Sequence, residues 1–111
     1  MARPAFRVEP NGPSSFRLFG DLDLASAPIF EDAVRSALHG EGDLTFDLSN
    51  LAFLDSIGVR ALFSAADAVG AHGGQVVLAS PNRTVANTLE LVRARDWPHL
   101  TVQPAFDVDP A

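Results

Sequence analysis

The chain has 111 residues, enough for one small hydrophobic core, and we expect a single domain over residues 1–111 with an irregular tail at 104–111. Its formal net charge is −6 and its eight basic residues are scattered arginines, which argues against nucleic acid and anionic membrane surfaces as partners. It has no cysteine and no apolar run near the roughly 20 residues that span a bilayer, which argues against disulfides and membrane insertion and favours a cytoplasmic location.

The predicted elements begin with two short strands. The segments AFRVE (5–9) and SFRLF (15–19) have β-type composition, and the Asn-Gly pair between them can close a hairpin because it adopts positive φ at little cost. Apolar residues then recur at helical spacing over 27–39, and Ser26 stands where a side chain can cap the helix. We therefore expect an antiparallel strand pair followed by a helix.

The rest of the chain alternates between strands and helices. Strands are predicted at 44–48, 75–79 and 99–103, and helices at 57–70 and 83–94. The resulting order is β-β-α-β-α-β-α-β. It predicts an α/β fold with a mixed sheet, in which the initial antiparallel pair is followed by largely parallel strands with helical crossovers.

The helix predicted at 57–70 has two distinct faces on a helical wheel. The side expected to face the sheet carries Val59, Leu62, Phe63, Ala66, Val69 and Gly70. The opposite side carries Ile57, Ala61, Ser64 and Ala68, flanked by Arg60 and Asp67. Small residues on an outer face suit the docking of another protein, and alanine also serves helix propensity alone, so the spacing leaves both interpretations open.

Ser56 stands immediately before this helix. As the N-cap, its hydroxyl would accept a hydrogen bond from a backbone N–H of the first turn. A phosphate on the same oxygen would face unpaired N–H groups at the positive end of the helix, next to Asp55, and would add nearly two negative charges to a docking surface around Ile57. The residues alone leave a cap and a phosphorylation switch both open.

A catalytic serine is the third interpretation of Ser56. The segment LDSIG lacks the first glycine of G-x-S-x-G, with Leu54 in its place, and none of the three histidines stands at a spacing that marks a base. No histidines and carboxylates have helical metal-ligand spacing, and GAHGG at 70–74 lacks the lysine of a P-loop. We therefore expect no enzyme activity, no metal and no cofactor.

Two sequence marks together resemble a known family. The first is G-[DE]-L-D at Gly20–Asp23, and the second is a strand-loop-D-S-[ST]-G segment that ends at Asp55–Gly58. In this order and spacing, over about 16–102, they resemble the STAS domain, the sulphate transporter and anti-sigma factor antagonist family. The resemblance is closest to the free-standing bacterial anti-sigma factor antagonists.

The resemblance implies a partner switch that regulates transcription. The unphosphorylated antagonist would bind an anti-sigma factor that is itself a small serine kinase of ATPase type, and would so free a sigma factor. That kinase would phosphorylate Ser56, and a metal-dependent serine phosphatase would restore it. The protein is expected to be a monomer or weak dimer, and its expected partner-binding residues are Asp23, Asp55, Ile57, Gly58, Arg60, Ala61 and Ser64.

Two departures from the family pattern support an alternative. Ile57 replaces the second hydroxyl residue of D-S-[ST]-G, which changes the surface that a kinase would read, and the proline-containing tail lacks the short final helix common in the family. The alternative is a constitutive STAS interaction subunit of a transporter, lipid-trafficking or signalling scaffold assembly, without a phosphorylation cycle.

Overall fold

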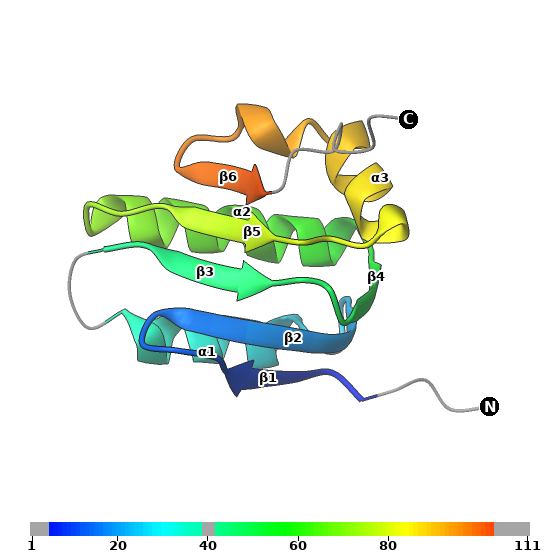
Figure 1. The fold of residues 1–111 in the computed structure, drawn as a ribbon, viewed down its shortest axis with the longest axis horizontal. Coiled ribbons are helices and arrows are strands. Elements are labelled where there is room, and N and C mark those ends of the chain that lie inside the picture. The colour runs from blue at the N-terminus through cyan, green and yellow to red at the C-terminus, as the bar shows by residue number, and fades with distance from the viewer. Residues whose placement is uncertain (1–4, 39–41, 104–111) are drawn as a thin grey trace.

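The structure, a computed structural model, describes residues 5–38 and 42–103. The tail at 104–111, predicted to be irregular, lies outside the described residues. Figure 1 shows the elements, which in chain order are β1 (Arg7–Pro10), β2 (Ser15–Leu22), α1 (Ala27–Ala37), β3 (Leu44–Asp47), β4 (Leu51–Leu54), α2 (Ser56–Ala71), β5 (Val76–Ala79), α3 (Arg83–Leu91), the 3₁₀-helix η1 (Ala94–Asp96) and β6 (Leu100–Gln103).

Within these residues, six strands form one mixed sheet in the order β1-β2-β3-β5-β6, with β4 beside β2 and outside this row. β1 and β2 are antiparallel, and all the other pairings are parallel. The predicted α/β fold, with an initial antiparallel pair and parallel strands joined by helices, is confirmed. The short strand β4 and the helix η1 are additions to the predicted order.

β2 is long because it pairs with two strands in turn. Its first half pairs with β3, and its end pairs with β4, where Leu22 lies beside Leu54. The register shifts between Gly20 and Asp21. At that point the chain needs glycine, because φ at Gly20 is +86° and a Cβ there would lie 2.7 Å from the carbonyl oxygen of Ala5.

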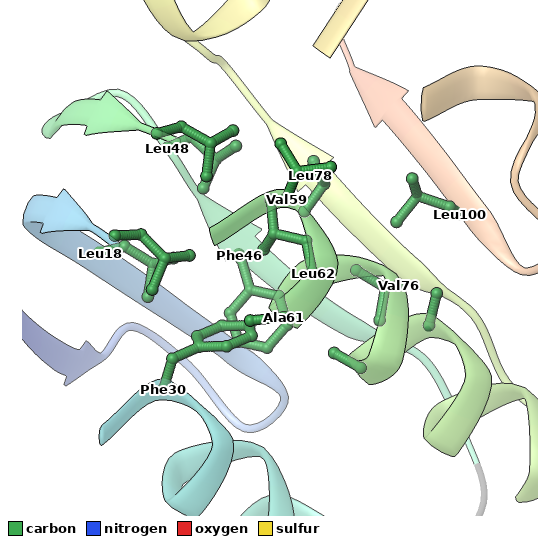
Figure 2. Packing of buried hydrophobic residues seen from close by; sticks show 14 of the residues in the cluster. Leu18, Phe30, Phe46, Leu48, Val59, Ala61, Leu62, Val76, Leu78 and Leu100 are labelled. Carbon is green, nitrogen blue, oxygen red and sulfur yellow. The ribbon is translucent and has the colours of Figure 1, made fainter. Parts of the chain in front are cut away.

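α1 and α2 lie side by side on one face of the sheet, behind the strands in Figure 1. The hydrophobic core lies between this helical layer and the sheet, and Figure 2 shows its packing. The Phe30 ring on α1 lies 5.0 Å from the Phe46 ring on β3, with an interplanar angle of 60°. Full burial of one such side chain contributes about 1.5–3 kcal/mol, so this contact anchors α1 to the centre of the sheet.

The sheet-facing side of α2 largely agrees with the prediction, but its outer side does not. Val59, Leu62, Ala66 and Val69 are buried, whereas Phe63 and Gly70 are only half-buried. Ala61, which was expected on the outer face, is only 3% exposed. It lies beside Phe30 in Figure 2, because α1 covers this flank of α2. The expectation of an exposed Ala61 is therefore wrong.

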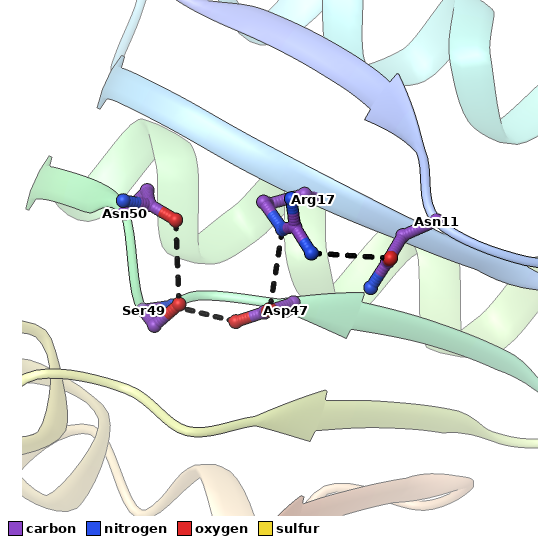
Figure 3. Close-up of polar contacts among 5 residues, drawn as sticks. All are labelled: Asn11, Arg17, Asp47, Ser49 and Asn50. Carbon is purple, nitrogen blue, oxygen red and sulfur yellow. Dashed lines mark hydrogen bonds and ion pairs between the residues drawn. The ribbon is translucent and has the colours of Figure 1, made fainter.

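The face of the sheet opposite the helices carries a polar cluster, shown in Figure 3. Arg17 Nε lies 3.6 Å from Asp47 Oδ2, and the Ser49 N–H donates to Asp47 Oδ1 at 2.9 Å. Partial burial alone raises the pKa of the Asp47 carboxyl. The hydrogen bonds from Ser49 and the Arg17 guanidinium outweigh that effect and hold this pKa below its ordinary value. The charged form of Asp47 therefore joins β2 to β3.

The third predicted helix, 83–94, is shorter than expected. α3 ends at Leu91, and Arg93 adopts a left-handed conformation with φ of 57° before η1 begins. A non-glycine residue in this region ends a right-handed helix. Val92 consequently lies at the C-cap of α3, where it is 39% exposed.

Candidate functional site

The two sequence marks meet at the edge of the sheet where β2 and β4 end. These strands are parallel, and their last residues, Leu22 and Leu54, are paired. Asp23 directly follows β2 and Asp55 directly follows β4, so both residues lie at the same edge of the sheet. The Asp55 N–H donates to the Leu22 carbonyl at 3.3 Å, which ties the two connections together.

Asp23 organises the turn that leads into α1. Its Oδ1 accepts hydrogen bonds from the N–H groups of Ala25, at 3.1 Å, and Ser26, at 3.2 Å. Ser26 occupies the N-cap position of α1, but its side chain does not cap that helix. Instead its hydroxyl donates to the Asp21 carbonyl at 2.7 Å and accepts from the Asp23 N–H at 2.9 Å. The two side chains together fix this turn beside the start of α2.

Asp55, and not Ser56, caps α2. The backbone of Asp55 is extended, with φ of −101° and ψ of −175°, and its Oδ1 accepts from the Gly58 N–H at 2.8 Å. Ser56 is the first helical residue, and its exposed hydroxyl makes no hydrogen bond to any residue that the structure describes. The expectation that Ser56 is the N-cap is therefore wrong, because the backbone enters the helix one residue earlier.

Gly58 is buried where the first turn of α2 crosses the end of β2. A Cβ at this position would overlap the carbonyl oxygen of Leu22 and would lie 2.7 Å from Cδ1 of Leu54. The glycine of the second mark is therefore what lets the helix start this close to the sheet. This approach also brings Ser56 next to the turn made by Asp23.

The exposed side chains of α2 form one stripe. Its members are Ser56, Arg60, Ser64, Asp67 and Ala71. Ile57 and Ala68, which were predicted on the outer face, are half-buried, and Ile57 packs against the core. The outer face is therefore rotated around the helix axis from its predicted position, because α1 packs beside Ala61 and Ala68.

A groove of about 400 Å³ runs along this stripe. Its walls come from α2 and from the segment after α3, and its lining residues are Ser56, Val59, Arg60, Phe63, Ser64, Asp67, Val92 and Trp97. The indole of Trp97 stacks on the Phe63 ring, with centroids 4.2 Å apart and planes within 7°, and its Nε1–H donates to Asp67 at 3.0 Å. The lining of the groove therefore combines apolar side chains, such as Phe63 and Trp97, with polar ones, such as Ser56 and Arg60.

Sequence reasoning did not place Val92 or Trp97 in this site. Trp97 is the only tryptophan of the chain, but nothing local to it indicates a contact with Phe63, more than 30 residues earlier. Two charged side chains of α2 line the groove, Arg60 and Asp67, and they differ in their contacts. Within the described chain the Arg60 guanidinium has no carboxylate partner, whereas Asp67 is held by Trp97.

Comparison with known families gives one match. The model of the STAS domain matches residues 7–106. Comparison with curated protein sequences finds no match. In the described part of the chain, no helix combines the length and the apolar character that a bilayer crossing requires.

Solved structures of anti-sigma factor antagonists share the fold. One from Mycobacterium paratuberculosis has a TM-score of 0.72 and 23% identity, and the match covers 94% of this chain and 88% of that one. Unphosphorylated SpoIIAA has a TM-score of 0.70 and 19% identity, with 94% and 92% covered. At this level of identity the likeness establishes the fold alone.

The same fold also occurs within a transporter. Murine Slc26a9, an anion transporter of the Solute Carrier 26 family, matches with a TM-score of 0.63 and 20% identity. The match covers 80% of this chain but only 16% of the transporter. The fold thus occurs both in free-standing antagonists and as one part of a membrane protein.

Proposed function

This chain belongs to the STAS domain family, and on that premise we propose that it is a cytoplasmic, non-catalytic anti-sigma factor antagonist. It would bind an anti-sigma factor of the small serine-kinase ATPase type, with Ser56 as the phosphoacceptor. The observation that carries the proposal is the Ser56 hydroxyl, which is exposed on a groove and has no structural task, because Asp55 caps the helix.

The proposed switch is electrostatic. The kinase would transfer the γ-phosphoryl group of ATP to Ser56 Oγ, which loses its proton, and ADP would leave. The phosphate adds about 1.5–2 negative charges at pH 7. Ser56 lies beside Asp55, and the Asp23 turn adjoins the same edge of the sheet, so the new charge joins a site that is already acidic. A partner fitted to the neutral serine would be repelled, and a metal-dependent phosphatase would reverse the change.

The proposed docking surface has exposed and supporting residues. Ser56, Arg60 and Ser64 line the groove on α2 and would contact the partner directly. The Asp23 turn adds Leu24, an apolar side chain that is 72% exposed. Asp55, Gly58, Ile57 and Ala61, which are half-buried or buried, would shape this surface from below. Large exposed apolar side chains beside polar ones are common where proteins meet.

A constitutive interaction module is the second candidate. Ile57 stands where the family motif has a second hydroxyl, and the transporter match shows this fold as part of a larger membrane protein. In that case Ser56 would carry no phosphate, and the partner would be a transport or scaffold protein. Under either candidate function, we expect the protein to be a monomer or a weak dimer.

A pull-down from a lysate of the native host distinguishes the two. The immobilised baits are wild type, Ser56→Ala, Ser56→Asp and a charge control, Ser36→Asp, at an exposed position on α1. The proposal predicts that a small ATPase-type kinase is retained by all baits except Ser56→Asp, and that with ATP it phosphorylates wild type but not Ser56→Ala. Retention of one transport or scaffold protein by all four baits would support the constitutive module instead.

A further inference from the structure

We infer that Arg60 is the internal receptor for a phosphate on Ser56, so that the phosphorylated chain forms a phosphoserine–arginine ion pair along α2. The inference rests on the proposed phosphorylation of Ser56 and concerns what the phosphate contacts once it is there. Both residues are exposed, both line the same groove, and they lie one turn apart on α2.

The spacing and the order of the two residues suit such a pair. Side chains four residues apart on a helix are neighbours, with Cβ atoms about 5–6 Å apart, and an anion placed before the cation is the more favourable order. A guanidinium also binds phosphate oxygens in a bidentate manner, which a lysine does not match. Arg60 therefore has the reach and the geometry for a phosphate on Ser56 Oγ.

The surroundings leave Arg60 available and make a cation necessary. Within the described chain Arg60 has no ion pair, whereas Arg35 on α1 is held by Asp32 at 2.6 Å. Asp55 already accepts from the Gly58 N–H, so the phosphate cannot use that donor. The Asp55 carboxylate also lies next in sequence to Ser56 and repels a phosphate there. Arg60 is the cationic side chain in the same groove that can offset this repulsion, in addition to the N–H groups at the start of α2.

The pair would change the groove at two positions at once. Phosphorylation adds negative charge at Ser56 and at the same time draws the Arg60 guanidinium towards the start of α2. A partner carboxylate that contacts Arg60 on the unmodified protein would lose that contact. The switch would then act by removing an attraction as well as by adding a repulsion.

The test measures the phosphate directly and needs no kinase or partner. Phosphoserine is placed at position 56 by suppression of an amber codon in the full chain, and the second pKa of the phosphate is followed by ³¹P NMR. An adjacent guanidinium favours the dianion, so Arg60→Gln should raise this pKa by about 0.15–0.4 units. Arg60→Lys should retain part of the effect.

The control is Arg35→Gln, which removes the same charge from α1, where Arg35 lines the cleft between α1 and α2 and not the groove of Ser56. It should leave the phosphate pKa unchanged. Circular dichroism establishes that each variant is folded. An equal pKa with and without Arg60, or an equal shift from Arg35→Gln, would overturn the inference. Because the phosphate is installed during synthesis, such a result is distinct from a failure of any kinase to phosphorylate Ser56.

Discussion

The Asp55 carboxylate accepts a hydrogen bond from the Gly58 N–H at 2.8 Å, which makes Asp55 the cap of α2. Loss of an N-cap typically costs about 0.5–2 kcal/mol, so Asp55→Ala should lower the free energy of unfolding by that amount. Ser56→Ala should change it by less than about 0.5 kcal/mol, because Ser56 is exposed and has no partner in the described chain. Urea denaturation measures both variants.

Asp55→Asn is the matched control for this prediction. Asparagine is as good an N-cap as aspartate, so this variant should retain most of the stability that Asp55→Ala loses. If Ser56→Ala proves as costly as Asp55→Ala, the assignment of the cap to Asp55 is wrong.

Gly58 should tolerate no side chain. A methyl group there would overlap the Leu22 carbonyl oxygen, which is backbone and cannot rotate away. Gly58→Ala should therefore destabilise the protein by more than about 2 kcal/mol, although alanine is the better helix former by about 1 kcal/mol. Thermal unfolding checks this against Ser64→Ala, an exposed α2 position where alanine should be neutral or slightly stabilising. A stable Gly58→Ala variant would contradict the close approach of α2 to β2.

The contact between α1 and α2 predicts a difference between Ala61 and Ser64. Ala61 is 3% exposed beside Phe30, so Ala61→Glu would bury a carboxylate against an aromatic ring and should cost more than about 2 kcal/mol. Ser64→Glu places the same side chain on the exposed stripe and should cost less than about 0.5 kcal/mol. Equal effects in chemical denaturation would mean that the two helices do not pack in this way.

Asp47 should stabilise the fold in a pH-dependent way. Burial opposes its ionisation, but Ser49 and Arg17 lower its pKa overall. A carboxyl with a lowered folded pKa contributes stability that is fully present above the unfolded value of about 3.9 and is lost as the pH falls through the folded value. Asp47→Asn should therefore be less stable than wild type at pH 7, and this difference should shrink below about pH 4. Urea titrations between pH 7 and pH 2.5 measure it, and a constant difference would refute the assignment.

Much of the fold follows from local patterns in the sequence. In the strand pair around the Asn-Gly turn and in the three helices, apolar residues recur with a period of two or of 3.6 residues. β4 could not be predicted in this way, because four residues are too few to establish a period. Its pairing with the end of β2 also joins segments about 30 residues apart in the sequence. Such a pairing depends on the path of β2 and not on the composition of LAFL.

The site was only partly predictable for the same reason. Asp55 and Ser56 are both good caps at adjacent positions, and only the backbone conformation decides which one serves. The outer face of α2 could not be placed from its own sequence, because the position of α1 determines that Ala61 is covered and Arg60 is not. The sequence alone identifies the motif residues, whereas tertiary packing determines which of them are exposed.

The stack of Trp97 on Phe63 gives the groove a built-in optical probe. The chain has one tryptophan and no tyrosine, so ultraviolet excitation at long wavelength reports on a single indole. That indole lines the same groove as Ser56 and Arg60. A partner that enters the groove will change the polarity around it, and the wavelength of its emission will follow. Occupation of this surface can therefore be titrated on the native protein, without any attached dye.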